Sequence, residues 1–345
     1  MSSETHRPVA LHACGGRLTH VAPETLDPQR ADVDEQLERH RVELTGYCYR
    51  MLGSAPDAED AVQETLTRAW RNIDRFEGRA ALRTWLYKIA TNVCFDSLSA
   101  SQKRAMPIDM GPAASATGPL DPPLGETVWV GPAPDAMVLD GNGDPAQLAE
   151  ARESVRLAFI AALQHLPPRQ RAVLILRDVL RWRASEVGDL LHLSVAAVNS
   201  ALQRARATLA SRDLEIAELS TASIDHASQE LLARYMDAFE RYDMGALAEL
   251  LHEDATQSMP PYPMWLRGRD ELLTWMTGAG AECVGSRLVP IDVNGQAGFA
   301  QYRDGGQTPW SIQVPVWRDG RVVDITYFLE TDGSLFALFG LPPKL

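Results

Sequence analysis

The sequence predicts a multidomain chain: two all-α helical domains joined by a flexible linker, followed by a C-terminal α+β cone. Apolar residues recur at helical spacing before residue 105 and again between 149 and 213. A stretch rich in Pro and Gly separates these two parts, and the last third combines helices with strand-like runs. The predicted parts are an N-terminal extension, a helical domain, the linker, a second helical domain and the cone, over 1–30, 31–105, 106–148, 149–213 and 214–345.

Composition limits the class of protein. The chain has 345 residues and a net charge of −13, which argues against a protein that coats nucleic acid but allows a locally basic face. Its four cysteines are scattered at no metal-ligand spacing, so neither a metal site nor a disulfide framework is expected. No apolar run could span a membrane and no signal-peptide pattern opens the chain. We therefore predict a cytoplasmic protein without a cofactor and without membrane contact.

The first helical domain contains the stretch 57–104, which carries both acidic and basic helices. One helix is expected over Val33–Gly53 and another after Ser54–Pro56. The polar side of the second helix is either a solvated face or a dock for a basic partner; it consists of Asp57, Glu59, Asp60, Gln63 and Glu64. After Gly78, the segment Leu82–Leu98 forms a third predicted helix that mixes cations with aromatic rings. Such a helix can hold phosphates and stack on unpaired bases, although the same rings could be core.

The second helical domain follows the Pro- and Gly-rich linker and has the layout of a helix-turn-helix. Two short helices between 184 and 209 flank a tight turn, and Ser194 is a natural N-cap for the second. Its outer positions are small or polar: Ala197, Asn199, Ser200, Gln203, Arg204 and Arg206. From Glu150 to Arg212, ten Arg outnumber five Asp and Glu, a net charge of about +5. The alternative is a helical hairpin with a solvated basic face.

The C-terminal third predicts helices followed by an antiparallel meander. The strand-like runs are Arg287–Val293, Ala297–Tyr302, Trp310–Arg318 and Arg321–Phe328, with turns at Asn294-Gly295, Asp304-Gly305-Gly306 and Asp319-Gly320. The residues His252-Glu253-Asp254 are expected to cap a helix end. An enzyme would need an acid–base pair inside the cone. Candidates are Tyr235, Asp237, His252, Asp254, Trp265 and Asp324, but none of them is predicted to be catalytic.

Two motifs carry a family resemblance. The stretch DAEDAVQETLTRAWRNIDRFEGRAALRTWLYKIATNVCFDSL, over 57–98, resembles the second conserved region of extracytoplasmic-function sigma factors. The stretch LPPRQRAVLILRDVLRWRASEVGDLLHLSVAAVNSALQRARATL, over 166–209, resembles the fourth region. The C-terminal third is similar to a SnoaL-like, NTF2-like domain. The order and pairing of these stretches are more specific than a lone helix-turn-helix.

The resemblance implies a non-enzymatic transcription initiation factor that binds promoter DNA and core RNA polymerase, at the largest-subunit clamp and the second-subunit flap. The acidic side given above matches the surface that docks on the clamp. Residues matching the −10 interface are Phe76, Glu77, Arg79, Arg83, Trp85, Lys88 and Asn92. Residues matching the −35 interface are Asn199, Ser200, Gln203, Arg204 and Arg206. Members often carry basic residues where this chain has Asn199 and Ala201, which implies weaker phosphate contacts or a different −35 sequence.

The resemblance also implies that the SnoaL-like domain packs on the sigma domains and tunes polymerase binding. Candidate contacts are Pro260–Leu266, the turn 304–306 and the tail 341–345. Two other functions stay open from the residues alone. A ligand-sensing DNA-binding regulator would use only the helix-turn-helix and leaves 57–104 unexplained. A cone-domain enzyme would carry the helical domains as fused DNA-binding regulators.

Overall fold

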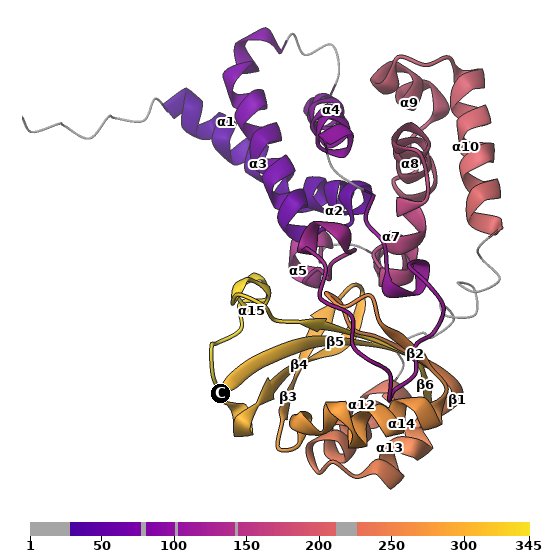
Figure 1. Ribbon diagram of the computed structural model, residues 1–345. Helices are drawn as coiled ribbons and strands as arrows, with labels where there is room; N and C mark the ends of the chain where they lie inside the picture. The colour runs from indigo at the N-terminus through magenta and orange to yellow at the C-terminus, as the bar shows by residue number, and fades with distance from the viewer. Residues whose placement is uncertain (1–27, 77–80, 101–102, 142–143, 212–225) are drawn as a thin grey trace, which may run out of the picture.

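The computed structural model describes residues 28–76, 81–100, 103–141, 144–211 and 226–345. Two helical domains lie side by side at one end of the molecule, and the cone lies at the other (Figure 1). The cone's sheet faces the helical domains with one side, and the helices over residues 226–250 and 269–277 cover the opposite side (Figure 1). The predicted class, two all-α domains with an α+β cone, is confirmed.

The first helical domain is a bundle. Its elements are α1 (Pro28–Glu38), α2 (Arg41–Leu52), α3 (Ala55–Arg71), η1 (Ile73–Arg75) and α4 (Leu82–Ala100). The helix expected over Val33–Gly53 is therefore two helices, α1 and α2. The second of these ends at Gly53, whose φ of 71° is left-handed. Ser54 then starts α3, because its side chain accepts a hydrogen bond from the Asp57 amide.

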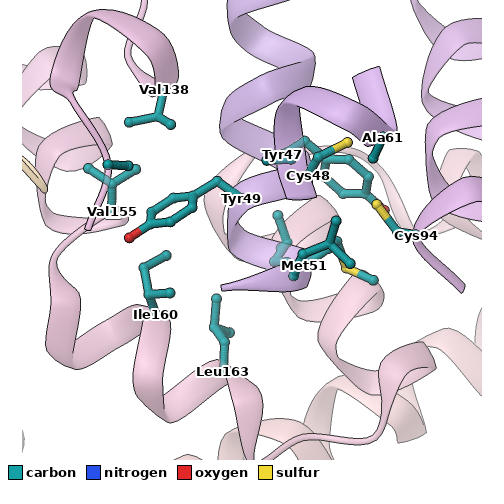
Figure 2. Packing of buried hydrophobic residues seen from close by; sticks show 14 of the residues in the cluster. Tyr47, Cys48, Tyr49, Met51, Ala61, Cys94, Val138, Val155, Ile160 and Leu163 are labelled. Carbon is teal, nitrogen blue, oxygen red and sulfur yellow. The ribbon is translucent and has the colours of Figure 1, made fainter. Parts of the chain in front are cut away.

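The core of this bundle is built around the aromatic residues of α2. Tyr47 and Tyr49 are fully buried, and they point to opposite sides of the helix (Figure 2). Tyr47 packs toward α4, where its ring lies 5.1 Å from that of Tyr87 and its hydroxyl lies 2.8 Å from Thr91 Oγ1. Tyr49 points toward Val155 of the second helical domain (Figure 2). The two tyrosines therefore connect α2 with both halves of the helical part.

The linker lies against the rest of the molecule. It contains η2 (Pro107–Asp109), η3 (Glu126–Val128) and α5 (Asp135–Val138). Its first half follows the cone: the Ala114 amide donates to Trp265 O at 2.8 Å and the Leu124 amide to Pro261 O at 2.9 Å. Its second half meets the helical part, where Val130 is fully buried. Burial of apolar linker residues explains why a Pro-rich segment has a defined path.

The second helical domain contains the predicted helix-turn-helix. Its elements are α6 (Pro145–Glu153), α7 (Leu157–Gln164), α8 (Pro168–Leu174), the π-helical turn η4 (Ile175–Val179), α9 (Ala184–Leu191) and α10 (Val195–Ala210). Two residues that are not glycine are left-handed at its turns, Arg181 with φ 58° and His192 with φ 56°. The turn between α9 and α10 is tight, because a Cβ on Gly188 would lie 2.6 Å from Leu193 O.

The cone contains a 6-stranded sheet in the order β2-β1-β6-β5-β4-β3. Its elements are α12 (His226–Glu240), α13 (Met244–Leu250), β1 (Leu251–Ser258), β2 (Trp265–Arg267), α14 (Arg269–Thr277), η5 (Ala279–Cys283), β3 (Arg287–Val293), β4 (Gln296–Arg303), η6 (Asp304–Gly306), β5 (Thr308–Arg318), β6 (Arg321–Leu329) and α15 (Ser334–Leu338). Strands β1 and β6 pair in parallel, and the other neighbours are antiparallel. The expectation that residues 252–254 cap a helix end is wrong, because they belong to β1.

The two faces of the sheet belong to different cores. Phe299 and Ile325 point to the inner face and pack with Tyr235 of α12. Ala300 and Val314 belong instead to the apolar cluster that runs into the helical domains. Alternation along each strand places successive residues on opposite faces, so one sheet serves both cores. The cone is thereby positioned directly against both helical domains.

Candidate promoter and polymerase interface

A cavity of about 370 Å³ opens between α3 and α4. Its lining residues recur at helical spacing on the two helices: Arg68, Asn72, Trp85, Ile89 and Asn92. Phe76 packs against one of these residues, since its ring lies 5.2 Å from that of Trp85. The cavity combines an aromatic wall, a cation and two amides, which are the groups that stack on a base and bond its edge.

The predicted −10 residues are divided by the fold. Trp85 and Asn92 line the cavity, and the Phe76 ring packs against Trp85. Arg83 lies on another face of α4, where its Nε bonds Glu43 at 2.7 Å. Lys88 is half-buried on the same helix and does not line the cavity. Glu77 and Arg79 lie outside the described residues.

Two cavity residues, Arg68 and Asn72, were not among the predicted sites. They stand four residues apart, Arg68 in the last turn of α3 and Asn72 at its C-cap, so the helical period shared with Trp85, Ile89 and Asn92 is the sequence signal that could have found them. Arg68 is held in place by Glu64, at 2.7 Å, and reaches Asp96 of α4 at 3.6 Å. These ion pairs place the Arg68 guanidinium between α3 and α4, beside the cavity.

The acidic side of α3 is only partly free for a partner. Glu59, Asp60 and Gln63 are exposed. Asp57 bonds the Arg104 guanidinium at 2.5 Å, and Glu64 bonds Arg68. Charge that is already neutralised attracts a basic partner less strongly. Glu59 and Asp60 are therefore the carboxylates of this face that are most open to a basic partner.

The helix-turn-helix presents a polar face on α10. Asn199, Ser200, Gln203 and Arg204 are exposed, as expected for residues that read a groove. Inner positions such as Val198 and Leu202 are buried, whereas Val195, the first residue of α10, is 47% exposed. The Ser194 side chain caps α10 by accepting from the Ala197 amide at 3.1 Å.

Two positions of α10 differ from the simple picture of a reading face. Arg206 is exposed but is tied to Asp178 by two hydrogen bonds, of 2.9 and 2.7 Å. Ala201 is buried, so this position faces the domain core rather than a phosphate. A neutral residue at position 201 therefore costs no phosphate contact, because this position does not reach the surface. Of the two neutral positions, only Asn199 is exposed.

The interior of the cone is filled by side chains. Tyr235 is buried between Phe299 and Phe239, and its hydroxyl lies 3.1 Å from Gln313 Oε1 and 3.2 Å from the Tyr327 hydroxyl. Burial raises the pKa of Tyr235 well above its ordinary value. The Tyr235 phenol therefore keeps its proton and hydrogen-bonds an amide and a second phenol.

The other candidate acid–base residues do not converge on Tyr235. Asp237 pairs with Arg241 on an exposed face of α12. His252 Nδ1 accepts from the Asp254 amide within β1. The Trp265 indole donates to Gly111 O of the linker at 2.8 Å. These contacts belong to the outside of the cone.

The larger cavity, about 1280 Å³, lies between the outer face of the sheet and the second helical domain. Phe159 and Leu209 form part of its helical wall, and Val314 and Asp324 form part of its sheet wall. Asp324 accepts a hydrogen bond from Thr256 Oγ1. Burial raises the pKa of Asp324 to about 6, because the enclosed site disfavours the carboxylate.

We expect Asp324→Asn to stabilise the chain above pH 7. The folded pKa of Asp324 lies above its ordinary value, so its ionisation costs stability as pH rises from about 4 to about 6. The gain is at most about 3 kcal/mol, since one pKa unit corresponds to about 1.4 kcal/mol. Urea unfolding at pH 5 and pH 8 measures it. An equal fall in stability between these pH values in both proteins would contradict the assignment.

The three cone segments that were candidates for contact with the helical domains have other hydrogen-bond partners in the structure. The stretch 260–266 holds the linker, through Pro261 and Trp265. The turn at Gly306 and the tail hold each other, since the Leu345 amide donates to Gly306 O at 2.8 Å. Closer contact with the helical domains comes from Gln296, which Arg156 reaches at 3.3 Å, and from the adjoining turn Asn294-Gly295.

Within the ranges given above, no three His, Cys, Asp or Glu side chains gather as metal ligands would. None of the helices in that part of the chain is long and apolar enough to cross a membrane. The described cysteines Cys48, Cys94 and Cys283 are free thiols.

A helix-turn-helix domain with an exposed polar helix, joined to a helical domain with an aromatic cavity and an acidic face, is the arrangement expected of a DNA-binding transcription protein. Three family models match the chain in the same order. Sigma-70 region 2 matches residues 37–104, Sigma-70 region 4 matches 156–209, and the SnoaL-like domain matches 232–333.

Relatives extend this match over nearly the whole chain. The ECF RNA polymerase sigma factor SigG of Mycobacterium tuberculosis is 44% identical over 327 residues, 93% of this chain and 87% of the relative. SigJ of the same species is 28% identical over 317 residues, 89% of this chain and 90% of the relative. The crystal structure of SigJ shares the fold, with a TM-score of 0.56 at 23% identity, over 91% of this chain and all of that one.

The chain therefore belongs to the extracytoplasmic-function RNA polymerase sigma factors. It functions as a sigma factor in transcription initiation, and its C-terminal part is a SnoaL-like domain. Hereafter, region 2 denotes the first helical domain and region 4 the second.

Proposed function

We propose that this sigma factor docks on core polymerase through the exposed acids of α3 and reads promoters through α4 and α10. Glu59 and Asp60 meet a basic or polar surface of the polymerase. The cavity beside Trp85 takes an unstacked base of the −10 element, and four exposed polar residues read the −35 element: Asn199, Ser200, Gln203 and Arg204. We further propose that the SnoaL-like domain acts by binding rather than by catalysis, and that regions 2 and 4 stay packed against each other until polymerase binds.

The observation that carries this regulatory proposal is the insertion of Trp182 into region 2. Trp182 follows the left-handed Arg181, and its side chain is 6% exposed. Its ring lies 5.1 Å from the ring of Tyr87 on α4, and the Arg83 guanidinium lies 5.6 Å from the Trp182 ring. A cation and an aromatic ring on one side of an indole form a favourable contact.

Buried arginines add to the contact between the two regions. Arg171 of α8 donates to Met51 O of α2 and to Gln164 Oε1. Arg50 of α2 donates to the Ser154 hydroxyl at 2.7 Å. Burial lowers the pKa of both guanidinium groups to about 10, because removing a charged group from water costs free energy. Such contacts are specific in geometry without being strongly stabilising.

The packed arrangement cannot serve both promoter elements at once. The −10 and −35 elements lie about 25 base pairs apart, which is about 85 Å along the duplex at about 3.4 Å per base pair. Two touching domains of about 70 residues span together only about 60 Å. Regions 2 and 4 must therefore separate before the factor can bind both elements, and contacts that hold them together oppose transcription.

Replacement of Trp182 tests the proposal. We expect Trp182→Ala to increase run-off transcription severalfold when the factor is limiting, because the region 2–region 4 contact loses its aromatic anchor. Trp310→Ala is the matched control: Trp310 also lies under an arginine, with Arg303 4.3 Å from its ring, but it belongs to the cone. Unchanged or lower transcription with Trp182→Ala would contradict the proposal, since loss of an inhibitory contact can only favour the separated form.

A further inference from the structure

The turn Asn294-Gly295 between β3 and β4 is buried among three parts of the molecule. Both residues are left-handed, with φ of 52° and 74°, as in the two-residue turns that favour Asn-Gly. A hairpin turn of this kind normally meets solvent. Here the Asn294 side chain is completely buried, which requires that its amide find partners within the protein.

The Asn294 amide bonds each of the three parts. Its Nδ2 donates to the Tyr49 hydroxyl in region 2 at 2.6 Å and to Val155 O, just before α7 of region 4, at 2.8 Å. Its Oδ1 accepts from the Ala133 amide of the linker at 3.1 Å. Tyr49 donates its own proton to Gly131 O at 2.8 Å, so its oxygen is an acceptor for Asn294.

The neighbouring residues fit the turn closely. The Gly295 amide donates to Asp135 Oδ1 of α5 at 2.7 Å. A Cβ on Gly295 would lie 2.3 Å from Arg152 O, so no side chain fits between the turn and α6. Figure 2 shows the Tyr49 ring reaching from α2 toward Val155.

We propose that Asn294 is the residue through which the SnoaL-like domain holds regions 2 and 4 together. One amide joins α2, the linker and the start of region 4, so moving any of the three away breaks a buried hydrogen bond. This inference rests on the proposed function, in which the two regions separate on polymerase. It adds that the cone, rather than the region 2–region 4 contact alone, sets how readily they separate.

Two substitutions remove the donor group while keeping the turn. Asn294→Gly preserves the left-handed backbone, and Asn294→Asp preserves both the backbone preference and the shape of the side chain. In the aspartate variant an acceptor faces Val155 O, which is itself an acceptor. Asp319→Gly is the control, because Asp319-Gly320 is also a left-handed turn, with φ of 49° and 75°, and is exposed between β5 and β6.

The measurement is energy transfer between labels on Asp34 of α1 and Ala207 of α10, both exposed, in the full chain titrated with core polymerase. In both Asn294 variants, we expect regions 2 and 4 to separate at about tenfold lower polymerase concentration than in the wild type. Loss of a buried hydrogen bond that leaves its partners unsatisfied shifts the equilibrium between the packed and separated forms about tenfold. Asp319→Gly should match the wild type. A thermal melt of each variant confirms that the cone is folded.

The double variant Asn294→Gly/Tyr49→Phe tests the named partner. If the amide acts through the Tyr49 hydroxyl, the effect of Asn294→Gly should shrink once that hydroxyl is gone. Fully additive effects would contradict this part of the inference.

Three results would overturn the inference, and they separate it from the proposed function. Asn294→Gly could behave like Asp319→Gly while Trp182→Ala eases separation; the amide is then not the tie, but the proposed function stands. Asp319→Gly could ease separation as much as Asn294→Gly, which would assign the effect to turns in general. Finally, the wild-type chain could show the separated distance without polymerase, and the proposed function itself would then fail.

Discussion

Core polymerase binding is expected to weaken about a hundredfold when Glu59 and Asp60 are both changed to arginine. These two carboxylates are exposed on α3 and carry most of the free negative charge of that face, because Asp57 is bonded to Arg104 and Glu64 to Arg68. Reversal of charge both removes attraction and places like charges against the basic partner. Fluorescence anisotropy of labelled factor against core polymerase measures the loss.

The control for charge reversal is the pair Asp34→Arg and Glu249→Arg. Both residues are exposed, on α1 and α13, and the double change alters the net charge equally. The α3 variant should also lose most of the salt dependence of binding, since screening acts on the charges that it removes. If the control weakened binding as much as the α3 variant, the effect would belong to net charge and not to a docking face.

The second large effect is expected on α10. We expect Gln203→Ala/Arg204→Ala to lower transcription from a promoter with a −35 element by about ten- to a hundredfold, because each side chain that contacts a base edge contributes about 1–3 kcal/mol of discrimination. Arg206→Ala should have a smaller effect, since Asp178 already holds that guanidinium. Run-off transcription and footprinting on one promoter compare the three proteins.

The ranking within α10 is the sharper part of this prediction. All three side chains are exposed on one helix, so a general loss of positive charge would weaken the Arg204 and Arg206 variants alike. Specific reading instead predicts that changes at Gln203 and Arg204 alter which −35 sequence is preferred. A larger loss from Arg206→Ala than from the double variant would contradict the proposed reading face.

Local signals in the sequence predicted much of the fold. The N-cap at Ser194 and the helical spacing of the apolar residues around it predicted α9 and α10. The turns at Asn294-Gly295 and Asp319-Gly320 predicted the strands β3 to β6. Strand β1 was missed because its residues, LHEDATQS, are mostly polar and no turn signal precedes them. It pairs with β6, more than sixty residues later, and such a partner is not visible in a local pattern.

The site was predictable in composition but not in arrangement. Arg83 and Trp85 were grouped on one helix, yet two residues apart on a helix point in different directions. Arg83 therefore meets Glu43 while Trp85 lines the cavity. The role of Asn294 could not be predicted, because its partners Tyr49 and Val155 lie 245 and 139 residues away in sequence.

The distance between regions 2 and 4 in a transcribing complex tests the central claim most directly. Energy transfer between labels on Asp34 and Ala207 should be high in the free factor, because Trp182 packs against Tyr87. It should be low in an open complex on a promoter with both elements, where the elements lie about 85 Å apart. An unchanged, short distance in a complex that makes run-off transcripts would contradict the account.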